Sequence, residues 1–210
     1  MKLVALDLDG TLLNRDGSIS KETIDQMNRL VNQGCSIAIA TGRPYKTTLQ
    51  LLAQNGLEPS VGFPQVLICD ERDIFYLENG AYQPELPWNE EAYDTELSLL
   101  DFSRQTIKEL ATKHRIEFLV NNPYMQQDRG YIEIFYWSRE LAEEAFPLFD
   151  ETLENQPIKP VRNNRLIAFR SREVGKGLML QKVANKLNLD ANEICRSRVG
   201  SAEGAGVPRQ

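Results

Sequence analysis

The stretch that decides the fold is residues 3–11, LVALDLDGT. Residues 3–8 form a short apolar run, which predicts a buried parallel strand. Asp7 and Asp9 stand where this strand ends, and in open α/β sheets ligands bind outside the carboxyl ends of the strands. Two carboxylates there predict a nucleophile and a proton donor for phosphate chemistry, and Gly10 allows a turn that brings backbone N–H groups near an anion. The alternative is a solvated acidic turn.

Working outward, strands alternate with helices in the next sixty residues. A helical pattern runs from Ser20, a plausible N-cap, to Gly34, a plausible C-cap. A second buried strand is expected at 35–40, a helix at 45–55 and a third strand at 65–69. This alternation is the signature of a parallel sheet with crossover helices.

The pattern then changes to an α+β character. Asn79-Gly80 predicts a hairpin turn, and Pro84, Pro87 and Trp88 indicate a linker. Further elements are expected as a helix near 96–114, strands at 116–120 and 130–136, a helix near 139–154, strands near 157–162 and 165–170, and a helix at 178–187. We therefore expect an α/β protein with a Rossmann-like parallel-sheet core at 1–83 and 172–210, and an inserted α+β domain at 84–171.

Composition narrows the class of partner. The chain has 210 residues and a net charge of −6, which argues against nucleic acid or an anionic membrane as the main partner. No apolar run is long enough to span a bilayer, and the N-terminus does not resemble a signal peptide. The three cysteines lack metal-ligand spacing and a disulfide pattern, so we expect thiols in a reducing cytoplasm. Nothing in the sequence specifies an oligomeric state.

Two further segments carry candidate anion-binding groups. Thr41-Gly42-Arg43 follows the second strand, where a hydroxyl and a backbone amide can hold a phosphoryl oxygen and Arg43 can bind a phosphate or carboxylate through two hydrogen bonds. The alternative for Thr41 is a helix N-cap. Lys176, between two glycines before a helix, can place an ammonium beside an anion; its alternative is a solvated lysine in a turn.

These three segments, DLDGTLL at 7–13, ATGRP at 40–44 and GKG at 175–177, together resemble the haloacid dehalogenase superfamily of phosphatases. The resemblance covers roughly residues 1–194, and the inserted domain resembles the large cap of sugar-phosphate phosphatases such as those acting on sucrose phosphate. It implies a cap that closes over the active site and supplies specificity. It also implies a small phosphorylated metabolite, such as a sugar phosphate, as substrate.

The resemblance further implies a role for each matching residue. Asp7 is the nucleophile that forms an aspartyl-phosphate, and Asp9 is the general acid and base. The Asp7 side chain and the Asp9 backbone carbonyl would bind Mg²⁺, which makes both residues metal ligands. Thr41 and Lys176 would hold phosphoryl oxygens, and Lys176 would neutralise Asp7.

The chain departs from the family near its C-terminal end. The family's fourth motif supplies further acids to the Mg²⁺ shell, but residues 195–210 contain one acid, Glu203, at a spacing that does not match. Weaker magnesium binding and impaired catalysis are therefore expected. We also expect an incomplete core sheet in which the first strand lacks a neighbour, because Arg196 and Arg198 suit a buried strand poorly. We therefore hypothesise that the C-terminal tail is truncated, deleted or read out of frame relative to an active relative.

Other polar residues have weaker signals. Asp70, Arg72 and Asp73 replace the Asn-Gly-Ala usual in related phosphatases, and are interpreted as a solvated loop or, alternatively, as substrate contacts. His114 is expected to cap a helix end. Candidate substrate contacts in the inserted domain are Asn121, Asn122, Tyr124, Gln126, Arg129 and Arg162 to Arg165.

The leading interpretation is thus a Mg²⁺-dependent phosphomonoesterase. The first alternative is a non-catalytic phosphate-binding or regulatory protein that retains Asp7, Thr41 and Lys176 without the metal shell. The second is a structural fragment that folds only with a partner covering the open sheet edge.

Overall fold

The computed structural model describes residues 2–120 and 129–196, which form two compact units. The core unit comprises the residues up to Cys69, the segment Ile74–Gln83 and the residues from Leu180 onward. The inserted unit comprises Asp70–Asp73 and Pro84–Met179. The short segment Asp70–Asp73 therefore groups with the inserted unit, although it directly follows a core strand.

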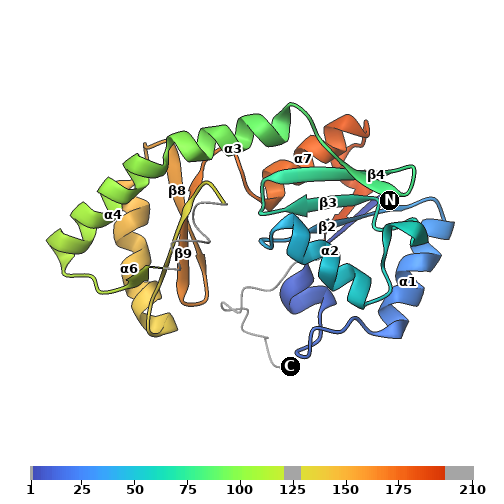
Figure 1. Cartoon of the computed structure of the whole chain (residues 1–210), viewed down its shortest axis with the longest axis horizontal. Helices are drawn as coiled ribbons and strands as arrows, with labels where there is room; N and C mark the ends of the chain where they lie inside the picture. The colour runs from blue at the N-terminus through green and yellow to red at the C-terminus, as the bar shows by residue number, and fades with distance from the viewer. Residues whose placement is uncertain (1, 121–128, 197–210) are drawn as a thin grey trace, which may run out of the picture. The chain divides into compact units, whose positions relative to one another are not determined.

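The core unit contains a sheet whose strand order is β10-β1-β2-β3-β4-β5 (Figure 1). Its parallel part consists of β1 (Leu3–Leu6), β2 (Ser36–Ala40), β3 (Val66–Cys69) and β10 (Ile194–Arg196). The register pairs Leu6 with Ile39 and Ala40 with Ile68, so that β1, β2 and β3 end at the same edge of the sheet. The expected α/β class with a parallel-sheet core is confirmed.

Helices of the core unit begin and end close to the expected residues. They are α1 (Lys21–Asn32), α2 (Tyr45–Gln54) and α7 (Lys176–Lys186), the last of which starts in the inserted unit. The Ser20 hydroxyl accepts a hydrogen bond from the Thr23 N–H, which confirms the expected N-cap of α1. Helices α1 and α2 pack on the sheet in one hydrophobic cluster. This cluster includes Met27 of α1, Leu52 of α2 and the strand residues Ile37, Ile39 and Leu67.

The predicted hairpin is confirmed. β4 (Asp73–Glu78) and β5 (Ala81–Pro84) are joined by Asn79 and Gly80, whose φ angles of 51° and 77° are those of a turn matched to the right-handed strand twist. Glycine and asparagine tolerate this left-handed region best, which is why the Asn-Gly pair predicted the turn.

The expectation that β1 lacks a neighbour on one side is wrong. β10 pairs with β1 in parallel, with Leu3 opposite Ile194 and Ala5 opposite Arg196. β10 is the outermost strand and has three residues, and an edge strand need not be apolar on both faces. The edge of β1 is therefore not open, and no partner is needed to cover it.

The inserted unit has its own sheet and core. Its antiparallel strands, in the order β6-β7-β9-β8, are β6 (Leu119–Val120), β7 (Ile132–Phe135), β9 (Leu166–Ser171) and β8 (Ile158–Asn163). Helices α4 (Leu100–His114) and α6 (Arg139–Thr152) pack against this sheet through a core that includes Ile107, Phe149 and Phe169 (Figure 1).

One helix of the inserted unit was not expected. The sequence indicated a linker at Pro84, Pro87 and Trp88 and a helix only from about residue 96, but a separate helix, α3 (Trp88–Ser98), begins at Trp88. Glu90 and Glu91 lie in its first turn, where acidic side chains complement the helix dipole. Its buried residues are Ala92 and Glu96, a combination without the apolar periodicity that marks a helix in sequence.

Two global properties follow from the described residues. No helix in residues 2–120 and 129–196 is long and apolar enough to cross a membrane. All three cysteines lie in these residues and none forms a disulfide: Cys35 and Cys69 are buried, whereas Cys195 on β10 is exposed.

Candidate active site

Asp7 and Asp9 lie on a tight turn at the end of β1. Asp7 is extended and half-buried, and the N–H groups of Leu12 and Leu13 donate to the carbonyls of Asp7 and Leu8 at 3.2 and 2.9 Å. Asp9 (φ −76°, ψ 123°) and Gly10 (φ 75°, ψ 2°) have type II turn angles, and the second position of such a turn requires a positive φ. The sequence DG therefore folds the chain so that two carboxylates follow one buried strand.

Thr41 and Arg43 follow the adjacent strand of the same sheet. Thr41 is fully buried, and its N–H donates to the carbonyl of Ile68 at 2.8 Å, which extends the β2–β3 pairing by one residue. Its hydroxyl accepts from the Arg43 N–H at 3.1 Å. The alternative that Thr41 caps the following helix is wrong, because the N-cap position of α2 is Pro44. Gly42, half-buried, lies in the bend between them.

The guanidinium of Arg43 binds Asp9. Arg43 Nε donates to Asp9 Oδ2 at 3.0 Å, and Nη2 donates to Oδ1 at 2.7 Å. The paired carboxylate raises the pKa of Arg43 further above its usual value. Both side chains retain substantial solvent exposure, 36% for Arg43 and 56% for Asp9, so the pair is accessible to a ligand. The Arg43 hydrogen bonds that we assigned to a phosphate or carboxylate ligand thus go to the candidate acid and base.

The chemistry of these donors fits a magnesium ion. Mg²⁺ takes oxygen ligands, commonly one or two carboxylates completed by water and substrate phosphate. Asp7 and Asp9 supply such oxygens, but residues 2–120 and 129–196 contain no group of three or more His, Cys, Asp and Glu side chains arranged to hold a metal. Protein ligands in this part of the chain would therefore be few. Glu203 lies outside the described residues.

Lys176 is part of the inserted unit and is the first residue of α7, so its interpretation as a lysine in a solvated turn is wrong. Its Nζ lies 3.7 Å from Oε1 of Glu71, with side-chain exposures of 36% and 22%. The N–H of the preceding Gly175 donates to the carbonyl of Glu71 at 2.8 Å.

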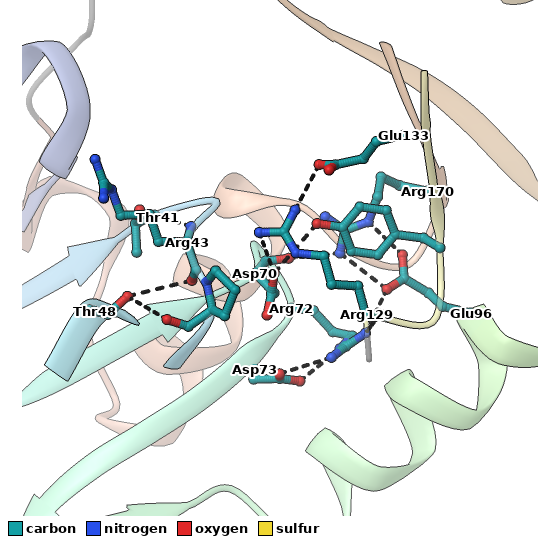
Figure 2. Close-up of polar contacts among 12 residues, drawn as sticks. Thr41, Arg43, Thr48, Asp70, Arg72, Asp73, Glu96, Arg129, Glu133 and Arg170 are labelled. Atoms are coloured by element: carbon teal, nitrogen blue, oxygen red, sulfur yellow. Dashed lines mark hydrogen bonds and ion pairs between the residues drawn. The ribbon is translucent and has the colours of Figure 1, made fainter. Parts of the chain in front are cut away.

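A buried ionic network occupies the inserted unit (Figure 2). Glu96 accepts from Arg72 at 2.9 Å, from Arg170 at 2.7 and 3.1 Å, and from the Ser171 N–H at 3.2 Å. Arg72 also binds both oxygens of Asp73, at 2.7 and 2.9 Å, and Arg129 binds Glu133 at 2.8 Å. The side chains of Arg72, Arg170 and Glu96 are at most 4% exposed. The prediction of a solvated loop at Asp70, Arg72 and Asp73 is therefore wrong.

Asp70 is the most perturbed carboxyl of this network. Burial raises its pKa to about 6, even though Arg129, Arg72 and Arg170 act in the opposite direction. Its Oδ1 lies 3.4 Å from both Arg129 Nη2 and the Tyr131 hydroxyl. The pKa of Asp70 is raised although three guanidinium groups lie nearby, because the cost of desolvating the carboxylate outweighs their attraction.

Sequence reasoning missed Glu96, Tyr131 and Arg170. The one local signal was Arg170 within the apolar strand pattern LIAFRS, since a charge in a buried strand needs a partner. Of the predicted substrate contacts, Arg162 pairs with Glu143 at 3.2 Å and Arg165 is exposed. His114 is the last residue of α4 and so lies at a helix end as expected, but the C-cap position is Arg115. Asn121, Asn122, Tyr124 and Gln126 fall outside the described residues.

The sequence has relatives among known proteins. The sequence model of the haloacid dehalogenase-like hydrolases matches residues 4–159. A 5-amino-6-(5-phospho-D-ribitylamino)uracil phosphatase of Bacillus subtilis (strain 168) is 38% identical over 86 residues, which is 40% of this chain and 31% of that protein. The matched stretch thus spans less than a third of that relative.

Solved structures share the fold over most of the chain. A haloacid dehalogenase-like hydrolase from B. subtilis aligns with a TM-score of 0.59 and 20% identity, covering 93% of this chain and 82% of that one. The sucrose-phosphatase of Synechocystis sp. PCC6803, solved with sucrose and phosphate, aligns with a TM-score of 0.64 and 15% identity, covering 93% and 74%. Identities this low show similarity of fold.

Proposed function

The chain belongs to the family of haloacid dehalogenase-like hydrolases, and from this premise we propose that it hydrolyses a phosphomonoester of a small metabolite. The observation that carries the proposal is the placement of Asp7 and Asp9 at the end of β1 beside Thr41 at the end of β2. A carboxylate nucleophile, a second carboxyl and a hydroxyl at one edge of a parallel sheet are the groups that an aspartyl-phosphate mechanism uses.

We assign Asp7 as the nucleophile. A carboxylate oxygen of Asp7 attacks phosphorus and forms a new P–O bond while the ester P–O bond breaks. The carboxyl proton of Asp9 goes to the departing alcohol oxygen. Asp9 then takes a proton from water, whose oxygen attacks phosphorus and releases inorganic phosphate and the Asp7 carboxylate. Arg43 donates one hydrogen bond to each oxygen of Asp9, so a guanidinium lies directly beside the carboxyl that transfers the proton.

We assign the phosphoryl oxygens to the Thr41 hydroxyl, the backbone at Gly10 and Gly42, and Lys176. The roles of Thr41 and Lys176 rest on the family resemblance. The Asp7 side chain and the Asp9 carbonyl would hold Mg²⁺, which supplies positive charge against the repulsion between a dianionic phosphate and an anionic nucleophile. The inserted unit is proposed as the cap that recognises the organic part of the substrate.

A sugar phosphate is the proposed substrate class. Support comes from fold similarity to a phosphatase solved with sucrose and phosphate, and from sequence similarity to a phosphatase whose named substrate carries a phosphoribityl group. Both substrates combine a terminal phosphate with several hydroxyl groups.

A second candidate function is phosphate binding without turnover. It is favoured by one observation: the described residues offer no set of three carboxylates for a metal. A chain that retains Asp7 and Thr41 but binds Mg²⁺ weakly would hold phosphate and not cleave the ester.

The test is phosphate release from an aryl phosphate and a panel of sugar phosphates in magnesium buffer. We expect turnover by the unchanged chain and a loss on the order of 10³-fold or more in Asp7→Asn, because removal of a nucleophile removes the covalent step. Asp25→Asn, an exposed aspartate on α1, is the matched control and should retain activity.

Two outcomes separate the functions. Turnover that persists in Asp7→Asn contradicts the assigned nucleophile. Saturable binding of inorganic phosphate by a folded chain that turns over none of the panel selects the binding function.

A further inference from the structure

The turn that follows β3 has an unusual backbone. Asp70 and Glu71 have φ angles of 51° and 54°, and neither residue is glycine. Two successive left-handed residues with side chains cost roughly 1 kcal/mol or more each, so they persist only where the surroundings fix them. Such backbone outliers cluster at functional positions. The contacts that fix this turn, and those that it makes to other segments, therefore bear on its function.

The turn is held from the inserted unit, of which it is part. Arg170 Nη2 donates to the carbonyl of Asp70 at 2.7 Å, and Trp88 Nε1 donates to the carbonyl of Arg72 at 3.0 Å. The Arg72 guanidinium is fixed in turn by Asp73, Glu96 and the carbonyl of Arg129. Both backbone and side chains of the turn are therefore fastened to the buried ionic network (Figure 2).

The turn itself holds the start of α7. The Glu71 carbonyl accepts from the N–H of Gly175, and the Glu71 carboxylate faces the ammonium of the next residue, Lys176, at 3.7 Å. On the other side Lys159 Nζ donates to the carbonyl of Val174 at 2.6 Å. Glu71 thus contacts two consecutive residues, and the more important of them is the proposed phosphate ligand.

The charge at this position calls for a counter-ion. A lysine at the first residue of a helix lies at the positive end of the helix dipole, where a cation is unfavourable and an anion is favoured. Glu71 supplies an anion in the ligand-free chain. A phosphate dianion is favoured by both the ammonium and the helix N-terminus, so it can replace the carboxylate.

We propose that the Glu71 carboxylate is a resident counter-ion of Lys176 that the phosphoryl group displaces. This inference rests on the proposed function, because it takes Lys176 as a phosphate ligand. It adds a preference among ligands to that function. A ligand has to compete with the Glu71 carboxylate at Lys176, and a dianionic phosphate monoester does so better than a monoanion.

The experiment measures affinity for inorganic phosphate by titration calorimetry in magnesium buffer. The protein is compared with Glu71→Gln, which keeps the shape of the side chain and removes its charge. Glu173→Gln is the matched control, since Glu173 is exposed, lies nearby in the sequence and carries the same charge. Loss of an exposed ion pair predicts that Glu71→Gln binds phosphate about two- to fivefold more tightly, while the control is unchanged.

A second measurement follows acetylation of individual lysines by mass spectrometry. Lys176 should react faster in Glu71→Gln than in the unchanged chain, and phosphate should protect it in both. Equal phosphate affinity in Glu71→Gln and the unchanged chain overturns the inference and leaves the proposed function intact, as does equal tightening in both variants. A folded chain that binds no phosphate, with Lys176 unprotected, overturns both.

Discussion

At the scale of single residues, Asp7 and Asp70 differ in how far the sequence predicts their environment. Asp7 could be predicted because its neighbours in the sequence, an apolar run before it and Asp9-Gly10 after it, fix where it lies. Asp70 could not, because its properties come from groups far along the chain: Arg129, Tyr131 and Arg170. A local pattern specifies the end of a strand; it does not specify which distant arginines are folded against that end.

Asp70 should make the stability of the protein depend on pH. Its pKa is raised from 3.8 to about 6, so the folded state holds the proton more tightly than the unfolded state. The stabilisation by this group is fully present below pH 3.8 and is lost as the pH rises through about 6. Asp70→Asn has no proton to lose, and asparagine tolerates the left-handed backbone at this position.

We therefore expect the free energy of unfolding of Asp70→Asn, relative to the unchanged chain, to increase between pH 4 and pH 7. Over this pH range a shift from 3.8 to about 6 corresponds to an increase of about 2 kcal/mol. Urea unfolding at unit steps of pH measures it. A difference between the two proteins that stays constant with pH contradicts the argument, whatever its absolute size.

At the scale of elements, α3 was not predicted because a charged residue lies on its buried face, where a sequence pattern would show apolar residues. Apolar runs in the sequence predict the core strands, and an N-cap at Ser20 predicts the start of α1. The buried face of α3 instead presents Ala92 and Glu96, and the partners of Glu96 stand 24 and 74 residues away. Such a helix is stabilised by tertiary contacts that no local window contains.

Glu96 should be essential to the inserted unit. Its removal in Glu96→Ala leaves Arg72 and Arg170 buried without this carboxylate, and breaking a buried ion pair costs about 3–5 kcal/mol. Glu90→Ala, on the exposed face of the same helix, is the matched control and should change stability by less than about 0.5 kcal/mol. Chemical denaturation of the two variants gives both values, and a loss in Glu96→Ala no larger than in the control would refute the role.

At the scale of the whole molecule, the described residues form two separate hydrophobic cores. The resemblance to a known family anticipated a core with an insertion, but the exact division depends on packing. Asp70–Asp73 belongs with the inserted unit, although these residues connect two strands of the core sheet. Which unit a connecting segment belongs to is decided by its partners in space.

Tryptophan fluorescence should report on one unit only. Both tryptophans of the sequence, Trp88 and Trp137, lie in the inserted unit, whereas circular dichroism reports on helices and strands of both. In Glu96→Ala we expect the fluorescence transition to move to lower urea by roughly 1 M or more, while part of the dichroism signal unfolds at the original concentration. Coincident transitions in this variant would mean that the two units unfold as one.

The distribution of cysteines has a practical consequence. Cys35 and Cys69 are buried in the core unit, and Cys195 is exposed on the outermost strand, opposite Val4. Of the three cysteine thiols, that of Cys195 is thus the accessible one for attachment of a fluorophore or spin label, without mutagenesis. A probe attached there would sit beside the strand that carries Asp7, and the two shielded thiols would become reactive when the core opens.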